Sequence, residues 1–476
     1  MVFFITAVVI LSAAAAEAAA SAVLHLQRMV PLNSSMVSVE HDRARDRVRH
    51  ARLFNGVVNF SVYGSADSFY YGIYFTKVKL GTPPKEFNLQ IDTGSELTWV
   101  SSKSCPSCPR SSRFGIELSH YDVAASSTSK VIPCSDKSCT AITLGDATRC
   151  SIDGQYCGYV MKYLDESATS GFYVADTFHF ESVSSNSTTL NASAGILFGV
   201  STYRSGMLAE TETAVDGIFG FGKQKLSVLS QLYYKGITPR VFSHCLKGGG
   251  TGGGVFVLGE VLAPGMVYTP LVPWQPHYSV HLENIVINGK LLPVDPKTFT
   301  PSADYATVLD TGTTFSYFVS EAYDLFVGAV SNNPFPILRT LVLLLYFSYV
   351  HWTFICRLFP LVSLNFAGGA SLSLKPEEYL FLSNALQQDG TTWCIGFQKA
   401  QGQTILGDLV LKDKIFVYDL VRQRIGWVKY DCSSSVNISV PNDDFFYLKQ
   451  SSSGSSSRGL LVQLLTVAIV TLFFSV

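Results

Sequence analysis

Charge is scarce along this chain of 476 residues, of which only 15% are Asp, Glu, Lys or Arg. The formal net charge is -1, so the sequence lacks the basic excess with which proteins bind the phosphates of nucleic acids. Hydrophobic residues make up 47%, which excludes a disordered chain, because so much apolar surface can form a core. We expect two or three domains' worth of folded material and no nucleic-acid partner.

The patterns of nucleophilic and metal-dependent catalysis are also missing. None of the nine histidines lies beside a nucleophile elbow, which argues against a Ser/His/Asp site. Cys105 and Cys108 have the spacing of half a zinc knuckle, but the next pair, Cys134 and Cys139, has the wrong spacing to complete it. We therefore expect no metal and no organic cofactor.

Apolar segments occupy both ends of the chain. Residues 1–20 combine an apolar run with Ala-rich A-x-A sites and predict a secretory signal peptide; an N-terminal anchor helix is the alternative. Residues 451–459 are Ser-rich, and the apolar run 460–476 ends the chain. This order fits a GPI-anchor signal, with a tail-anchored membrane helix as the alternative. We expect a protein of the secretory pathway that is extracellular or held at the cell surface through its tail.

Exported proteins carry disulfides and N-linked glycans, and the sequence has positions for both. Ten cysteines, an even number, predict disulfides without specifying their pairing. Asn-x-Ser/Thr sequons occur at Asn33, Asn59, Asn186, Asn191 and Asn437.

A basic run precedes the main body of the chain. Residues 41–52 read HDRARDRVRHAR, with five arginines against two aspartates. One interpretation is a solvated basic helix. The other, which we adopt, is a removable pro-segment at residues 21–69 that covers an acidic cleft at neutral pH. The sequons at Asn33 and Asn59 would leave with it.

From Tyr70 onward the pattern is that of short β-strands. In residues 74–80 Tyr, Thr, Val and Leu take every second position and two lysines lie between them, as in a strand with one buried face. Residues 285–289, Ile-Val-Ile-Asn-Gly, predict a hairpin. Helical patterns are few, and the best candidates are residues 227–234 and 320–330. The fold class is therefore all-β.

Two tetrapeptides of one type end apolar strands in the two halves of the chain. Asp-Thr-Gly-Ser at 92–95 follows Leu-Gln-Ile, and Asp-Thr-Gly-Thr at 310–313 follows Thr-Val-Leu. Their aspartates lie 218 residues apart (310 minus 92). One Asp-Thr-Gly alone is commonly a surface turn, but two copies with the same flanks indicate duplicated lobes.

With these motifs the chain resembles the pepsin family of aspartic proteases, in its plant branch with a cysteine-rich insert, over residues 70–432. Residues 216–220, Asp-Gly-Ile-Phe-Gly, and 404–408, Thr-Ile-Leu-Gly-Asp, match the apolar-apolar-Gly segments that follow each catalytic loop in that family. Tyr163 stands where the family has its flap tyrosine, and Trp99 stands where the usual partner of that tyrosine lies.

The resemblance implies a bilobal pepsin-like fold with the active site in the cleft between two pseudo-symmetric β lobes. We expect an N-terminal lobe at residues 70–270, a C-terminal lobe at 271–432, and a Ser-rich stalk with the apolar tail at 433–476. The implied function is that of a monomeric aspartic-type endopeptidase that hydrolyses polypeptide substrates at acidic pH and binds pepstatin-like inhibitors. A catalytically impaired binding or inhibitor-like protein is the alternative.

The resemblance also implies a role for each residue of the site. Asp92 and Asp310 would share one proton and activate one water, because two adjacent carboxylates cannot both ionise comfortably; this dyad is itself the standard example of that principle. The supporting residues would be the interlocking Thr93 and Thr311, Ser95 and Thr313 on the outer carboxylate oxygens, Gly94 and Gly312 beside the carboxylates, and Tyr163 closing over the substrate.

Three features depart from the family pattern. Leu164 and Glu166 replace the usual glycines of the flap, which should stiffen the hairpin tip, or strain it where φ is positive. Val200 replaces a cysteine of relatives and leaves a later cysteine without its usual partner, for which Cys432 is the candidate. Residues 340–356 carry no charge, and we interpret them as a buried strand pair, a membrane segment or an incorrectly spliced reading frame.

Overall fold

The protein is described here by a computed structural model, and the described residues all belong to one unit, residues 49–476. They are residues 56–66, 72–142, 150, 154–184, 189–249, 252–302, 306–331, 359–383, 392–400, 402–434, 436–439 and 445–448. The expected signal peptide, most of the expected pro-segment, the apolar run 340–356 and the apolar tail lie outside these ranges, so those predictions remain predictions. No helix within the described ranges has the length and hydropathy needed to cross a bilayer.

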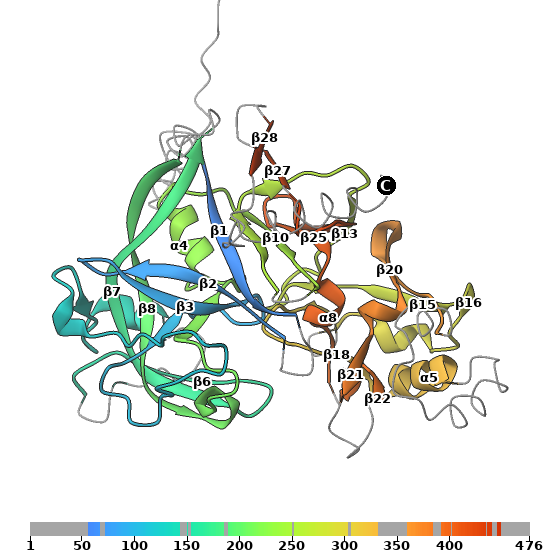
Figure 1. The fold of residues 1–476 in the computed structure, drawn as a ribbon, viewed down its shortest axis with the longest axis horizontal. Helices are drawn as coiled ribbons and strands as arrows, with labels where there is room; N and C mark the ends of the chain where they lie inside the picture. The colour runs from blue at the N-terminus through green and yellow to red at the C-terminus, as the bar shows by residue number, and fades with distance from the viewer. Residues whose placement is uncertain are drawn as a thin grey trace, which may run out of the picture. The chain divides into compact units, whose positions relative to one another are not determined.

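The N-terminal half consists mainly of strands, as the alternating pattern predicts (Figure 1). Its strands are β1 (Gly56–Ser65), β2 (Ile73–Leu80), β3 (Lys85–Asp92), β4 (Trp99–Ser101), β5 (Lys130–Val131), β6 (Gly158–Lys162), β7 (Ala168–Ser184), β8 (Thr189–Ser205), β9 (Gly217–Gly220), β10 (Val241–Leu246), β11 (Gly254–Leu258) and β12 (Glu260–Val261). Its helical segments are η2 (Val123–Ala125), α3 (Lys137–Ile142), η3 (Gly206–Ala209) and α4 (Val228–Tyr234).

The C-terminal half repeats this mixture with shorter strands. These are β13 (Val267–Pro270), β14 (Ser279–Val280), β15 (Leu282–Ile287), β16 (Lys290–Leu291), β17 (Thr307–Leu309), β18 (Ser316–Val319), β19 (Val362–Phe366), β20 (Ala370–Leu374), β21 (Leu380–Ser383), β22 (Thr392–Ile395), β23 (Phe397–Ala400), β24 (Thr404–Leu406), β25 (Lys414–Asp419), β26 (Arg424–Lys429), β27 (Val436–Ser439) and β28 (Phe445–Leu448). The helical segments are η4 (Pro296–Phe299), α5 (Ser320–Ser331), η5 (Ala367–Gly369), η6 (Pro376–Glu378) and α8 (Asp408–Leu411).

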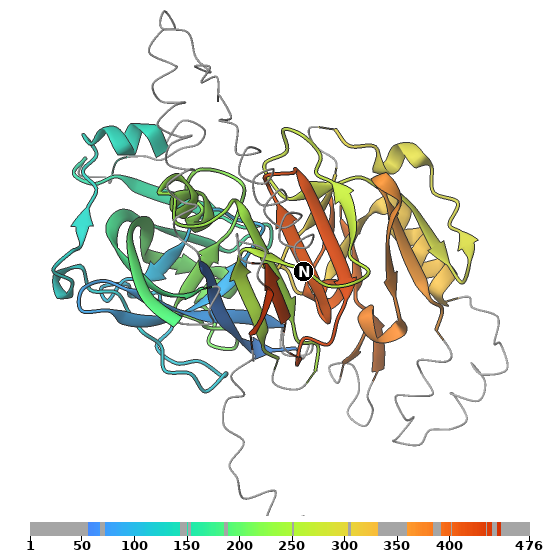
Figure 2. The same ribbon diagram turned by 90° about the horizontal axis from the view of Figure 1, so that it is seen from above.

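One sheet joins the two halves. Among the described residues it has fourteen strands, in the order β13-β26-β25-β10-β11-β1-β2-β3-β9-β4-β8-β7-β5, with β6 added to β7. The junction is the antiparallel pair of β10 and β25, in which Val241 lies opposite Asp419. In Figure 2 the red-orange strands that include β25 and β26 lie between the blue and green strands of the N-terminal half and the yellow and orange strands of the C-terminal half. The all-β bilobal prediction is confirmed.

The local predictions from the sequence are also confirmed. Strand β2 exposes its two lysines and buries its other side chains, which alternate with the lysines in the second half of the strand. The Asn-Gly turn connects β15 and β16, and both Asn288 and Gly289 have positive φ, which hairpin turns of this type require. Ser227 caps α4 by accepting a hydrogen bond from the amide of Ser230, and α5 begins at Ser320.

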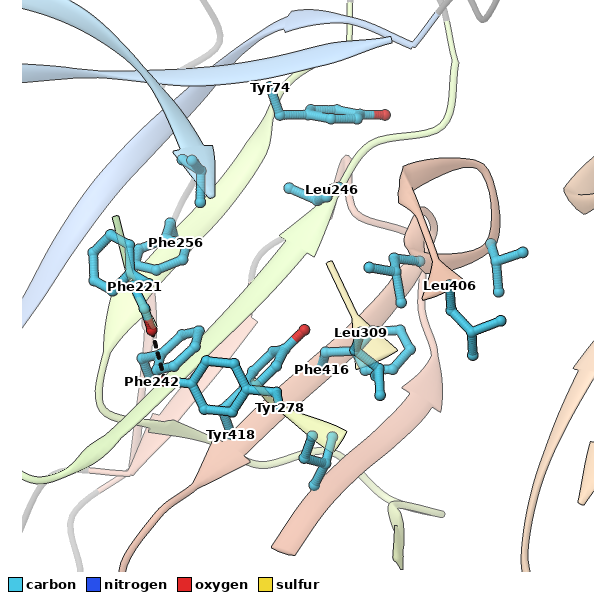
Figure 3. Packing of buried hydrophobic residues seen from close by; sticks show 14 of the residues in the cluster. Tyr74, Phe221, Phe242, Leu246, Phe256, Tyr278, Leu309, Leu406, Phe416 and Tyr418 are labelled. Atoms are coloured by element: carbon cyan, nitrogen blue, oxygen red, sulfur yellow. Dashed lines mark hydrogen bonds between the residues drawn. The ribbon is translucent and has the colours of Figure 1, made fainter. Parts of the chain in front are cut away.

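Aromatic side chains from both halves form the core beneath the joining strands (Figure 3). The ring of Phe242 on β10 stacks on that of Tyr418 on β25, with centroids 4.4 Å apart, and Tyr278 meets Tyr418 edge to face. The Tyr278 hydroxyl donates to the carbonyl oxygen of Phe221, which satisfies its buried polar atom. The core of one half is therefore continuous with that of the other.

The disulfides correct the prediction for Cys432 and decide between a disulfide and a zinc knuckle at Cys105 and Cys108. Cys432 is paired, with Cys245 of β10, so the expectation that Cys432 lacks a partner is wrong. The bond joins the end of the C-terminal half to the joining strands. Cys105 and Cys108 form a disulfide with each other, and the half zinc knuckle is thereby ruled out. Within the part of the chain that the structure describes, Cys134 also pairs with Cys150, and Cys139 with Cys157.

Strand β1 belongs to the joining sheet, although it precedes the expected start of the N-terminal lobe at residue 70. It pairs with β11, β2 and β7. Its Asn59, one of the five sequons, lies opposite Val257 in this pairing. The boundary of the pro-segment at residue 69 stays a prediction, which the N-terminal sequence of the mature protein would test.

Candidate active site

Each of the two aspartates lies at the end of a strand that is clamped by a parallel neighbour. Strand β3 ends at Asp92 and runs parallel to β9, and Asp310 follows β17, which runs parallel to β24. The carbonyl of Asp92 accepts the amide of Phe221, and the amide of Asp310 donates to Leu406. The apolar-apolar-Gly segments of the sequence are therefore the strands that hold the two loops.

The two carboxyl groups face each other across the junction. A hypothetical Cβ on Gly94 would lie 2.6 Å from Oδ1 of Asp310, and one on Gly312 would lie 2.5 Å from Oδ1 of Asp92. Only glycine fits in either place, because the opposite carboxylate occupies the space of a side chain. Besides burial, the proximity of Asp310 raises the pKa of Asp92, as expected for two neighbouring carboxyl groups.

Each carboxyl group accepts a glycine amide and a hydroxyl from its own loop, and Oδ1 of Asp92 also accepts the amide of Ser95 at 3.2 Å. Oδ1 of Asp92 accepts the amide of Gly94 at 2.8 Å, and its Oδ2 accepts the hydroxyl of Ser95. Oδ1 of Asp310 accepts the amide of Gly312 at 2.8 Å, and its Oδ2 accepts the hydroxyl of Thr313 at 2.6 Å. These donors favour the ionised form and fix both carboxyl planes.

Two buried threonines bind the loops to each other. The amide of Thr93 donates to Oγ1 of Thr311 at 3.2 Å, and the amide of Thr311 donates to Oγ1 of Thr93 at 3.0 Å. Each hydroxyl then donates to the strand of the opposite half, Thr93 to the carbonyl of Leu309 and Thr311 to that of Ile91. The four bonds satisfy every polar atom involved and hold the two loops at one separation.

Burial and mutual repulsion decide the charge of the pair. Asp92 is only 4% exposed, and burial together with the Asp310 carboxylate raises its pKa to about 7. Asp408 of α8 packs nearby, where its amide donates to the carbonyl of Thr313. Burial, and then the charge of Asp310, raises the pKa of Asp408 well above its usual range, so Asp408 is neutral in acid. The dyad consequently keeps one shared proton below neutral pH.

The predicted flap lies beside Asp92. Tyr163 follows β6, and its hydroxyl accepts a hydrogen bond from Nε1 of Trp99 at 2.8 Å. Burial and the Asp92 carboxylate raise the pKa of the Tyr163 phenol, so it stays protonated and able to donate. The structure thus brings together every residue that the sequence placed in the site.

The tip of the flap shows the strain expected from its missing glycines. Glu166 has a φ of 66°, in the region that favours glycine. Two hydrogen bonds from Ser167 to Oδ1 of Asp165, by its amide and its hydroxyl, hold the turn. Leu164 is 85% exposed at the tip.

Two charged residues of the site were not singled out from the sequence. Glu96, next to Ser95, is partly buried, and burial raises its pKa to about 7. Arg204 is 3% exposed and lies with its guanidinium carbon 4.5 Å from the centre of the Trp99 ring. The register of β8 shifts opposite Ser170 and Gly171, so an alternation with a period of two does not continue to this arginine, and no simple signal for its burial is present in the sequence. Within the described ranges no cluster of His, Cys, Asp and Glu could hold a metal ion.

Comparison with known proteins agrees with this geometry. Residues 74–260 match the family model described as "Xylanase inhibitor N-terminal", and residues 277–429 match the one described as "Xylanase inhibitor C-terminal". Aspartic proteinase 36 and aspartic proteinase 39 of Arabidopsis thaliana are each 35% identical, over 90% of this chain and 89% of their own length. Aspartic proteinase nepenthesin-1 of Nepenthes gracilis is 26% identical over 76% of this chain and 79% of its own length.

A two-lobed β fold with paired aspartyl loops defines the class of pepsin-like aspartic proteinases. The chain belongs to this family, and it is an aspartic-type endopeptidase whose substrates are polypeptides.

Proposed function

We propose that the protein cleaves polypeptides in acid by means of a water molecule that Asp92 and Asp310 activate together. The ionised carboxylate takes a proton from the water, and the protonated one donates a hydrogen bond to the oxygen of the scissile carbonyl. The water adds to the carbonyl carbon to form a diol, and return of the proton to the nitrogen expels the amine. The facing carboxyls, 4% and 8% exposed and matched in their hydrogen bonds, are the observation that carries this proposal.

The other residues of the site prepare this reaction. Thr93 and Thr311 keep the loops at a fixed separation, which allows one proton to serve both carboxyls. Tyr163 closes over the substrate and reduces the access of water. As pH rises past about 7 the shared proton is lost and activity falls, because two ionised carboxylates can no longer donate to the carbonyl.

Cleavage of an unfolded polypeptide near pH 4 by the processed protein tests the proposal. Asp92→Asn should abolish cleavage and pepstatin should block it. Asp324→Asn is the matched control, because Asp324 is an exposed carboxylate paired with Lys399. This variant should cleave at the rate of the unchanged protein. Failure to cleave at any pH from 2 to 7 would contradict the proposal.

A binding or inhibitor-like protein is the second candidate, supported by the altered flap and by the description of the matching family models. Titration with pepstatin separates the two functions. An intact dyad with a closing flap binds this peptide, whereas a cleft without catalytic function does not. Absence of both cleavage and pepstatin binding, together with inhibition of a xylanase, would favour the second candidate.

We also propose that the protein passes through the secretory pathway and is held at the cell surface by a GPI anchor. The apolar segments at both ends of the sequence support this location, and so do the disulfides. Asn191 is exposed at the start of β8 and could carry a glycan. A phospholipase that cleaves GPI anchors should release the protein from intact cells. Retention after this treatment would indicate the tail-anchored helix instead.

A further inference from the structure

Arg204, near the end of β8, is a buried cation that the proposed catalytic steps do not use. Its guanidinium donates to three main-chain carbonyl oxygens, those of Leu208 at 3.4 Å, Val215 at 3.1 Å and Asp216 at 2.6 Å. Within the described ranges its Nε has no hydrogen-bond partner. A buried cation whose hydrogen bonds are incomplete destabilises the fold unless something else compensates. The environment of Arg204 therefore suggests a functional reason for its position.

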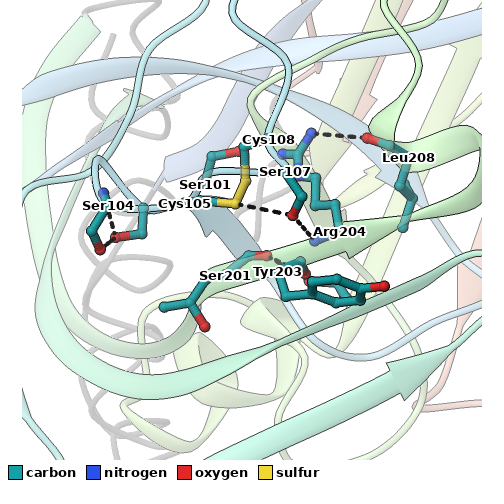
Figure 4. The surroundings of a disulfide bond; sticks show 12 residues. Ser101, Ser104, Cys105, Ser107, Cys108, Ser201, Tyr203, Arg204 and Leu208 are labelled. Atoms are coloured by element: carbon teal, nitrogen blue, oxygen red, sulfur yellow. Dashed lines mark hydrogen bonds between the residues drawn. A yellow bond between two sulfur atoms is a disulfide. The ribbon is translucent and has the colours of Figure 1, made fainter.

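The backbone of Arg204 is fixed by the loop of a short disulfide (Figure 4). Cys105 and Cys108 are three residues apart and almost fully buried, and Ser107 lies between them. The hydroxyl of Ser107 accepts the amide of Arg204 at 2.9 Å. Figure 4 shows this serine between the disulfide and the arginine, so the disulfide loop and the three carbonyls together leave the guanidinium little freedom.

Trp99 lies between this guanidinium and the flap. Arg204 is stacked on the indole ring at 4.5 Å, and the indole Nε1 donates to the hydroxyl of Tyr163 at 2.8 Å. Trp99 itself is completely buried, and it begins β4 only four residues after Ser95 of the aspartyl loop. A contact that fixes the plane of this ring also fixes the direction of its N–H bond.

We propose that Arg204 is a positioning residue, which holds the indole of Trp99 so that its N–H points at the flap tyrosine. A cation over the ring face attracts the π electrons, and this makes the N–H a stronger donor. Tyr163 then accepts a stronger bond and becomes a better donor itself, because linked hydrogen bonds polarise one another. The charge is present in acid, since burial lowers the pKa of Arg204 only to about 10. This inference rests on the proposed role of Tyr163 as the flap residue.

A double-mutant cycle in cleavage distinguishes action through Trp99 from a general loss of structure. Arg204→Met and Trp99→Phe should each lower kcat/KM by about tenfold. The double variant should be no worse than Trp99→Phe alone, because the arginine then has no indole N–H to orient. Additive losses would overturn the proposal. Arg204→Gln, which can still donate to a carbonyl, serves as a second variant should the methionine variant not fold, and it should behave alike.

Arg424→Met is the matched control, because this guanidinium also stacks on an aromatic ring, that of Tyr268, at 3.8 Å. Tyr268 lies on β13 at the opposite end of the joining sheet from the flap strands, so kcat/KM should not change. An equal loss in this variant would show that any stacked arginine is needed for the fold, and it would overturn the specific role of Arg204.

The indole N–H resonance of Trp99 gives a readout that does not require activity. The chain has five tryptophans, and Trp99→Phe identifies the signal by its disappearance. In Arg204→Met this resonance should shift and exchange faster with solvent, while in Arg424→Met it should stay in place. An unchanged resonance in Arg204→Met would contradict the proposal. If the unchanged protein cleaves nothing, the proposed function fails, and the resonance still decides the role of Arg204.

Discussion

A methyl group on Gly94 would lie 2.6 Å from the carboxyl carbon of Asp310, which is 216 residues further along the chain (310 minus 94). Gly94→Ala should therefore displace the Asp310 carboxyl and lower kcat by about a hundredfold, as small misplacements of catalytic groups do. Gly195→Ala on β8 is the control, because a Cβ there meets nothing within 4 Å. Steady-state cleavage assays measure both, and an active Gly94→Ala would show that the carboxyls do not approach so closely.

The threonine interlock should be visible in stability. Thr311→Val keeps the shape of the side chain but leaves the amide of Thr93 and the carbonyl of Ile91 without their partner. We expect a loss of about 1–3 kcal/mol in the free energy of unfolding, because buried polar groups without partners are costly. Thr311→Ser retains the hydroxyl and should recover most of the loss. Urea unfolding monitored by fluorescence gives the midpoints, and equal midpoints for the two variants would contradict the prediction.

His244 should limit stability in acid. It is buried on β10, where its Nε2 lies 3.3 Å from the Tyr418 hydroxyl, and burial lowers its pKa from 6.5 to about 3. The pKa of His244 is lower in the folded protein than in the unfolded chain. The contribution of His244 to the free energy of unfolding is therefore complete above pH 6.5 and is lost as the pH falls towards 3. The contribution should fall by about 1.4 kcal/mol per pH unit within this window.

His244→Phe should remove this dependence. The unfolding free energies of both proteins are measured at steps between pH 7 and 3. The value for the unchanged protein should fall relative to that for the variant as the pH is lowered. Parallel curves would mean that His244 does not stay neutral in the folded protein.

The bond between Cys245 and Cys432 can be detected directly. Peptide mapping without reduction should give one linked pair of peptides containing these residues, and reduction should separate them. Cys432→Ser should lower the free energy of unfolding by about 2–5 kcal/mol, because the bond closes a loop of 187 residues. Finding Cys432 as a free thiol in the mapped protein would restore the prediction from sequence that the structure overturned.

Much of the site could be predicted from short stretches of sequence. The Asp-Thr-Gly turns at 92 and 310, the strands that precede them and the Asn-Gly hairpin at 288 depend on neighbours within a few residues, so their pattern is local. Resemblance to the family drew attention to Leu164 and Glu166 in place of the flap glycines, and the positive φ at Glu166 is the strained of the two outcomes expected there. Resemblance then supplied the partner of Tyr163.

The sequence by itself determined the strand pattern and the paired aspartyl turns. Only the tertiary structure decided that Asp92 faces Asp310, that Cys432 bonds to Cys245, and that Arg204 lies under Trp99. The physical reason is distance along the chain. These contacts join residues about 100 to 220 positions apart, and local preferences carry no information about which strands meet in a sheet.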